Sequence, residues 1–299
     1  MERRNASAPT HRDPDAEWVD CNIPIDAREA AGVTNRRAQL RSRLEEDEDP
    51  FLGLFLRFFP LAVYEAHLAE LATRPLASRH VIRWTKGVFL RWIGLLMRMT
   101  TQPLPNYEWH WRWLADFPVA SHNSLKLLIT EVRLKQYWAK VCIPGYFDDV
   151  TDEVDEIGTT SELYNSVKAL QQAFCDRWQA AWTPGNVIVP DESMIFWTGT
   201  GEVHINYIPR KPTPYGIEMK TLACASARIV LQMEMVEGRE LDATKKYRDQ
   251  VGASTATTLR LCEPWAGSGR IVVADAWFGS CNTAEWLMDV LGFVLHPCS

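Results

Sequence analysis

A stretch punctuated by prolines, from Val187 to Cys224, constrains the fold of this chain more than any other segment. A β-branched run over 187–189 ends at Pro190, a Gly-rich turn follows over 198–201, and prolines recur at positions 209, 212 and 214. Each proline lacks an amide donor and biases the preceding residue towards extended geometry, so residues 209–214 cannot be helical. The alternation of residues from Tyr215 onwards predicts a strand.

The connector over 207–212, which we call the strap, also carries positive charge from Arg210 and Lys211. A stiff basic segment of this kind suits contact with phosphate groups. The alternative is a solvated connector between two domains, which the spacing alone favours.

Four motifs follow one another in a fixed order: DESM at 191–194, YIPRKP at 207–212, YGIE at 215–218 and ADAWFGS at 274–280. Together they resemble the signature of piggyBac-type transposases and their domesticated derivatives. The resemblance covers the chain from about Phe51 to its C-terminus. One of these motifs alone would be weak, whereas the ordered set is specific.

Composition sets limits on what the chain can contact. The 299 residues are 46% hydrophobic and 23% charged, as in an ordinary globular protein of about two domains. The formal net charge of −6 argues against a protein coated in positive charge, so contact with DNA requires a local basic patch. The seven cysteines form no C-x-x-C pair, which favours reduced thiols over a zinc site or disulfides. The residues show neither a signal peptide nor a membrane span, so we expect a soluble intracellular protein without membrane contact.

The chain divides into three predicted parts. Residues 1–50 are polar and charged, which predicts a disordered tail. Its arginines at positions 36, 37, 41 and 43 are either a contact for DNA or nuclear import, or an idle solvated segment. Residues 51–186 are predicted to be helical, and the resemblance implies that this region dimerises and binds DNA. The resemblance makes 187–299 a partial RNase H-like core of a DDE transposase, giving a mixed α+β fold overall.

Apolar residues recur at helical spacing over 51–59, 61–71, 80–100 and 126–140. The clearest helix begins at Thr159, which forms a capping box with Glu162, and its stripe runs to Ala181. Basic residues interleave with these stripes. Packing in the core, with long basic side chains reaching solvent, is the more common reason for that pattern. Lys126 and Arg133 join Arg210 and Lys211 as our candidates for DNA contact.

After Tyr215 the sequence predicts the order of the core. A strand is followed by an antiparallel partner over 228–236, a loop over 238–251 and a helix over 254–263. A buried strand over 270–274 then leads to Asp275, and Asn282 opens a last helix that ends at Leu291. This order matches the first part of an RNase H-like fold, as the resemblance implies.

The resemblance also implies the chemistry: three aspartates that hold two Mg²⁺ ions. Asp275 matches the second aspartate, and the third would lie beyond Ser299. Either Cys224 or, with a one-residue gap, Ala225 stands at the first position. A thiol is mostly neutral at pH 7 and its sulfur is a soft ligand, so neither residue can replace the carboxylate.

Other acids offer no clear replacement. In the family, Asp191 and Glu192 precede the core strand and are not metal ligands, while Glu285 and Asp289 match no ligand position. We therefore expect an inactive, C-terminally truncated remnant with no cofactor, Mg²⁺ being bound only if an active site is intact. The resemblance further implies DNA and a second copy of the chain as partners, and a nuclear location. Two alternatives stay open: a fragment of an active transposase from a truncated gene, and an interaction protein that no longer binds DNA.

Overall fold

The computed structural model describes residues 38–41, 49–73, 85–101, 110–111, 129–141, 143–145, 161–196, 204–212 and 214–295. All of these lie in one compact unit, Arg36–Ser299. Most of the expected tail, the Gly-rich turn over 198–201 and the capping residue Thr159 fall outside the described residues. The cysteines that the structure describes are free thiols, as predicted.

The first helices follow the apolar periodicity of the sequence. They are α2 (Pro50–Phe58), α3 (Leu61–Thr73), α4 (Lys86–Thr101) and α6 (Glu131–Val141). The side chain of Asp49 caps α2, and Pro60 separates this helix from α3. At the centre of their core, Tyr64 stacks between Phe59 and Phe89, with ring centroids 5.2 and 4.5 Å away. Aromatic packing therefore holds this region together.

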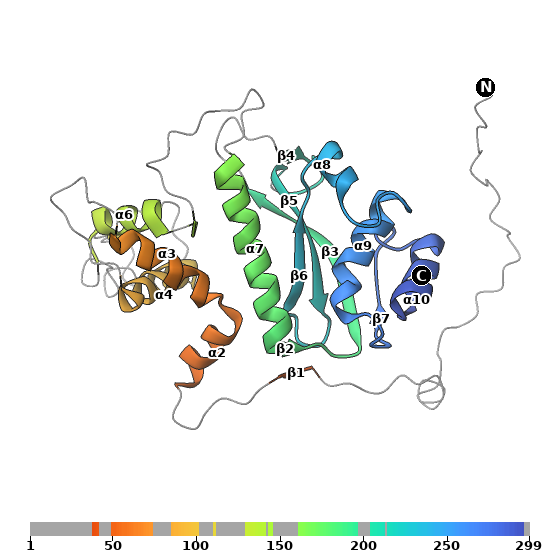
Figure 1. Cartoon of the computed structure of the whole chain (residues 1–299), viewed down its shortest axis with the longest axis horizontal. Coiled ribbons are helices and arrows are strands. Elements are labelled where there is room, and N and C mark those ends of the chain that lie inside the picture. Colours follow the sequence, from red (N-terminus) through yellow and green to blue (C-terminus); the bar gives the residue numbers. More distant parts are fainter. Residues whose placement is uncertain are drawn as a thin grey trace, which may run out of the picture. The chain divides into compact units, whose positions relative to one another are not determined.

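A mixed sheet forms the second part. Its strands are β3 (Val187–Phe196), β4 (Ile205–Tyr207), β5 (Tyr215–Cys224), β6 (Val230–Met235), β7 (Ile271–Val272) and β8 (Val294–Leu295). β5 runs antiparallel to β3, and its other edge pairs with β4 and β6. β3 also runs parallel to β7, which runs parallel to β8. This arrangement confirms a partial RNase H-like core (Figure 1).

The remaining helices are α7 (Ser161–Ala181), α8 (Arg239–Thr244), α9 (Ala253–Cys262) and α10 (Cys281–Leu291). α9 and α10 pack on one face of the sheet. Ile188, Leu222 and Val272, from three neighbouring strands, are fully buried in one cluster with Leu259 of α9 and Leu287 of α10. Their burial provides the main hydrophobic stabilisation of the core.

α7 links the sheet to the helical region, and it lies beside β6 (Figure 1). Towards the helical region, the ring of Phe174 meets that of Phe59 edge-on, with centroids 5.5 Å apart. Towards the sheet, Gln171 Nε2 donates a hydrogen bond of 2.9 Å to the carbonyl oxygen of Met233. The helix therefore has tertiary contacts along both of its sides.

A short strand lies inside the segment expected to be a tail. β1 (Gln39–Leu40) pairs antiparallel with β2 (Trp182–Thr183), which follows α7. The next residue, Arg41, donates from its amide to the carbonyl of Ala181 at 2.9 Å and from Nε to the carbonyl of Trp182 at 3.3 Å. One arginine of the predicted basic cluster is thus bonded to the end of α7.

Pro190 determines where the parallel ladder between β3 and β7 stops. The amide of Val273 donates to the carbonyl of Ile188 at 3.1 Å. Along a strand, every second residue directs its amide to the same side, so the next donor towards β7 would be residue 190. Proline has no such donor, and β7 ends at Val272.

The structure corrects three details of the predicted core. α8 occupies part of the segment expected to be a loop over 238–251. The last helix is capped two residues before Asn282 by Ser280, whose hydroxyl oxygen accepts from the amide of Thr283 at 3.1 Å. β8, a strand after the last predicted helix, pairs with β7 and extends the sheet.

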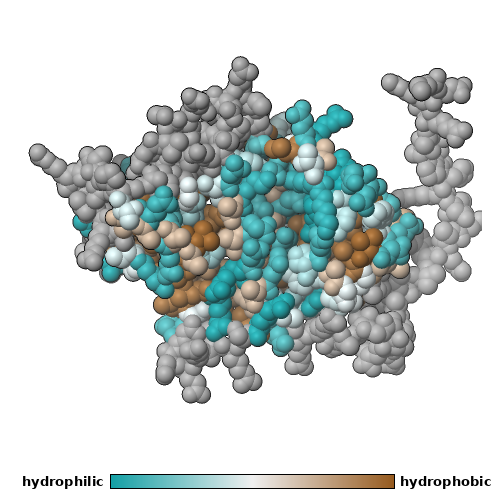
Figure 2. Space-filling view, viewed as in Figure 1, coloured by the Kyte–Doolittle hydropathy of each residue, from teal (hydrophilic) through white to brown (hydrophobic). Residues whose placement is uncertain are grey.

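Hydrophobic surface is distributed unevenly. Figure 2 shows hydrophilic side chains over α7, while hydrophobic side chains gather over α2 to α4 and in a second patch near α9 and α10. Among the residues that the structure describes, the most exposed large apolar side chain is Phe51 on α2, at 85%. Among the helices that the structure describes, none alone is long and apolar enough to cross a membrane; α2 and α3 meet the criterion only as a pair bent by 85°.

Gly216 permits the close approach of β5 to β3, and we predict that Gly216→Ala destabilises the protein. A Cβ atom at this position would lie 2.2 Å from the carbonyl oxygen of Ile195, a backbone atom that cannot move aside without disturbing the ladder. Urea denaturation should show a loss of about 2–3 kcal/mol in unfolding free energy. The control is Gly94→Ala in α4, where a Cβ meets nothing within 4 Å and should not destabilise the helix. Equal effects of the two changes would contradict this account.

Candidate functional site

Asp275, the predicted second aspartate, follows the end of β7 as expected. Asp275 is exposed, and its Oδ1 accepts hydrogen bonds from the amides of Trp277 and Phe278 at 3.0 and 3.2 Å. The carboxylate thereby caps the turn that leads towards α10. One oxygen of Asp275 thus has a structural role in addition to any role as a ligand.

Cys224 does not lie beside Asp275. It pairs with Ile188 of β3, which pairs in turn with Val272, three residues before Asp275. The thiol is fully buried and accepts a hydrogen bond from the amide of Gly185 at 3.4 Å. Burial acts to raise the pKa of Cys224, but hydrogen bonds, chiefly with the Ser226 hydroxyl and then with Gly185, outweigh burial and lower it. Ala225, the alternative residue at the first-aspartate position, lies in the turn directly after β5.

Asp191 and Glu192 lie on β3, between β5 and β7, so they belong to the core sheet. Our expectation that they precede its first strand was wrong. Asp191 comes three residues after Ile188, and Asp275 comes three residues after Val272, the partner of Ile188. Asp191 lies within β3, whereas Asp275 lies in the turn beyond the end of β7, so both follow the last pair of the parallel ladder but only Asp191 is on a strand. The predicted strand ended at Pro190, although Met194, Ile195 and Phe196 continue a β-forming run beyond the proline.

The acids at this end do not complete a metal site. Across the residues that the structure describes, no group of three or more His, Cys, Asp or Glu side chains could hold a metal ion. Two Mg²⁺ ions need several carboxylate oxygens in near-octahedral geometry. The described residues therefore do not fit the metal pair that the resemblance implies.

The strap forms the connection between β4 and β5, and no part of its described residues is helical, as the prolines predict. Its two cations converge on Glu192 of β3: Arg210 Nη2 lies 3.2 Å and Lys211 Nζ 3.0 Å from Oε1. The Glu192 side chain is 7% exposed, whereas that of Arg210 is 73% exposed. The strap is therefore ion-paired to the sheet and still presents one guanidinium to solvent.

The other two candidates for DNA contact lie elsewhere in the chain. Arg133 is an exposed residue of α6, on a different element from the strap. Lys126 lies outside the described residues. The prediction that these four cations act together therefore stays a prediction.

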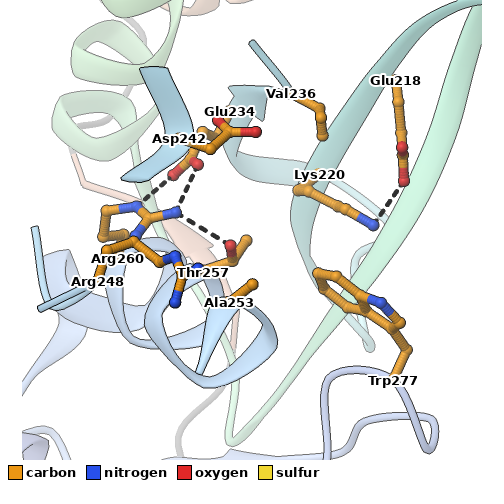
Figure 3. Close-up of a pocket in the computed structure, with 10 residues that line it drawn as sticks. All are labelled: Glu218, Lys220, Glu234, Val236, Asp242, Arg248, Ala253, Thr257, Arg260 and Trp277. Carbon is orange, nitrogen blue, oxygen red and sulfur yellow. Dashed lines mark hydrogen bonds and ion pairs between the residues drawn. The ribbon is translucent and has the colours of Figure 1, made fainter. Parts of the chain in front are cut away.

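A cleft of about 180 Å³ lies beside the turn that Asp275 caps (Figure 3). Lys220 Nζ lies 3.6 Å from the ring centroid of Trp277 and 2.6 Å from Glu218 Oε1. Across the cleft, Arg260 donates to both oxygens of Glu234 at 2.7 and 2.8 Å. Because these charges are paired with one another, the cleft offers an aromatic ring to a ligand rather than free carboxylates.

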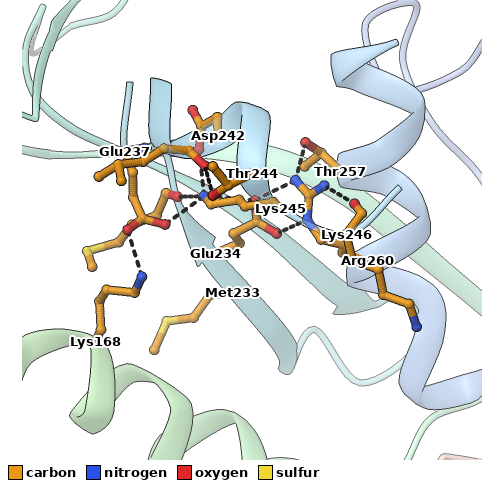
Figure 4. A network of polar contacts seen from close by, with 12 residues as sticks. Lys168, Met233, Glu234, Glu237, Asp242, Thr244, Lys245, Lys246, Thr257 and Arg260 are labelled. Carbon is orange, nitrogen blue, oxygen red and sulfur yellow. Dashed lines mark hydrogen bonds and ion pairs between the residues drawn. The ribbon is translucent and has the colours of Figure 1, made fainter. Parts of the chain in front are cut away.

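A network of ion pairs continues from this cleft to α7 (Figure 4). Lys245 Nζ lies 3.2 Å from Glu234 Oε1, 2.6 Å from Asp242 Oδ1 and 2.9 Å from Glu237 Oε2. Lys168 of α7 completes the network, 2.8 Å from Glu237 Oε1. These side chains bond α7, β6, α8 and α9 to one another.

Glu237 is the most strongly perturbed acid of this network, and its side chain is 5% exposed. Burial acts to raise the pKa of Glu237, but hydrogen bonds from Lys168, Tyr164 and Lys245 outweigh it and lower the pKa to about 2. The carboxylate is therefore ionised throughout the physiological range. The sequence carried no signal for this network, because its members come together only through the register of the strands.

Comparisons with known proteins agree with this geometry. A family model described as Transposase IS4 matches residues 52–290. A solved structure, the piggyBac transposase synaptic complex with hairpin DNA, superposes with a TM-score of 0.60 at 18% identity, covering 87% of this chain. The chain spans 53% of the length of that transposase. No curated protein sequence matches the chain.

We predict that Glu237→Gln reduces the dependence of stability on pH. The folded-state pKa of Glu237, about 2, lies below the ordinary value, so the carboxylate stabilises the fold above about pH 5 and loses this effect as the pH falls towards 2. Between pH 6 and pH 2.5 the unchanged protein should lose on the order of 2 kcal/mol more unfolding free energy than the variant, measured by urea denaturation. Exposed Glu240→Gln is the control and should behave like the unchanged protein. Identical pH profiles for all three proteins would remove Glu237 from this role.

Proposed function

Because the chain belongs to the Transposase IS4 family, we propose that it is a transposase-derived protein that binds DNA but does not cut it. The absence of DNA cutting is proposed because the set of metal-binding carboxylates is incomplete. Cys224 or Ala225 stands where the resemblance expects the first aspartate, and no group of three metal-binding side chains occurs among the described residues. Asp275 alone cannot hold two divalent ions.

The DNA-binding half of the proposal is supported by the strap. The net charge of −6 leaves DNA contact to a local patch, and Arg210 is highly exposed on a connector held against the sheet. The solved transposase of the same fold is a complex with hairpin DNA. A nuclear location and a homodimer, both implied by the resemblance, complete the proposal.

A metal-dependent nuclease is the second candidate. Asp191 and Asp275 each come three residues after the last pair of the parallel ladder, Ile188 and Val272, and two carboxylates in such positions are the beginning of a divalent-metal site. This candidate requires at least one further carboxylate from residues outside those described. It would make the chain part of an active transposase.

The two candidates differ in their expected DNA chemistry. Purified protein incubated with Mg²⁺ or Mn²⁺ and supercoiled plasmid should neither nick nor join DNA, because the acids for two-metal catalysis are incomplete. Gel electrophoresis measures this directly. Metal-dependent nicking that is lost in Asp191→Asn and in Asp275→Asn, but kept in Glu285→Gln, would establish the nuclease instead.

DNA binding should depend on the strap. Replacing Arg210 and Lys211 together by Gln should weaken binding to all DNA sequences, because phosphate contacts do not read bases. The slope of log affinity against log salt, measured by fluorescence anisotropy, should become shallower by about one unit. Arg239→Gln, an exposed charge change on α8, is the control. An unchanged slope in the double variant would make the strap a structural connector only.

A further inference from the structure

The two cations of the strap are not equivalent. The side chain of Lys211 is 25% exposed, and that of Arg210 is 73% exposed, although both pair with the same carboxylate. Lys211 Nζ contacts Glu192 twice, at 3.0 Å from Oε1 and at 3.5 Å from the backbone carbonyl. The positive charge of Lys211 is therefore neutralised by an ion pair within the protein.

The backbone of the strap closes on itself around this contact. The amide of Ile208 donates to the carbonyl of Pro214 at 2.8 Å, and the amide of Lys211 donates to the carbonyl of Ile208 at 3.1 Å. Such a turn has few internal hydrogen bonds, because its prolines supply no donors. The ladder between β4 and β5, which ends at the pair Tyr207 and Tyr215, fixes both ends of the strap, and the contacts of Arg210 and Lys211 with Glu192 join its middle to β3.

Arg210 remains available for a ligand. A guanidinium has five N–H donors in a planar fork, and the contact with Glu192 involves Nη2 alone, at 3.2 Å. A planar fork of this kind matches two phosphate oxygens. The position next to Lys211 in the chain means that whatever holds Lys211 also orients Arg210.

We propose that Glu192 is a positioning residue: by binding Lys211 it holds the strap against β3 so that Arg210 alone is presented to the phosphate backbone. The proposal deepens the proposed DNA binding and rests on it. Glu192 and Lys211 act through Arg210 and do not touch the DNA. The DESM and YIPRKP motifs thus act together, because Glu192 of the first motif holds Lys211 of the second in place.

The full chain and four single variants test this: Glu192→Gln, Lys211→Gln, Arg210→Gln and, as a matched charge control, exposed Glu240→Gln. Hydrogen exchange of the peptide over 205–215 should accelerate about tenfold in the first two variants and stay unchanged in the control. In DNA binding, Arg210→Gln should reduce the salt slope by about 0.9, the value for one phosphate contact, whereas Lys211→Gln should leave the slope unchanged. Glu192→Gln should bind several-fold more weakly than Glu240→Gln, although both carry the same net charge.

Each outcome decides a different part. Unchanged exchange in Glu192→Gln overturns the positioning role, whatever the DNA results are. A slope reduced equally in Lys211→Gln and Arg210→Gln would mean that Lys211 contacts phosphate itself, which also overturns the proposal. If exchange accelerates as expected but the unchanged protein binds no DNA, the proposed function fails while the contact between Glu192 and the strap stands.

Discussion

Pro190 lacks an amide donor, and the end of the sheet at which Asp275 follows β7 depends on this constraint. β3 is the central strand, antiparallel to β5 on one side and parallel to β7 on the other. A residue with an amide at position 190 could extend the parallel ladder beyond Val272. Proline stops it there, and the chain is free to form the turn that Asp275 caps. The exposed position of that carboxylate thus follows from a residue on another strand.

Buried charge is the second organising constraint. Glu192, Lys220 and Glu234 lie opposite one another on three neighbouring strands, so a row of alternating sign crosses the sheet. An isolated charge in such a position is strongly unfavourable, and each member of the row has an oppositely charged partner. The row connects the strap at one end to the ion pairs of Lys245 at the other. If the strap binds DNA as proposed above, the carboxylate that pairs with it is a member of this row.

Local sequence pattern was sufficient for much of the fold and insufficient for the site. The strand from Tyr215 and the helix ending at Ala181 were predictable, because periodicity and breakers are encoded nearby. β3 was predicted too short, since a proline in a central strand is rare and its tolerance depends on where β7 ends. The contact of Glu192 with the strap was not predictable at all, because it depends on which residues the register brings face to face. Register is a property of the assembled sheet rather than of any one segment.

α7 has a consequence for how the molecule can be divided. A helix of 21 residues is about 32 Å long, and this one packs against Phe59 on one side and bonds to Met233 on the other. A fragment starting at Val187 would contain every strand from β3 to β8 but would lose Tyr164 and Lys168, two of the partners of the buried Glu237 carboxylate. A fragment that contains the sheet and keeps these contacts therefore has to start at Ser161, the first residue of α7, rather than at the first core strand. A domain boundary drawn for protein engineering should therefore keep α7 in the same fragment as the sheet.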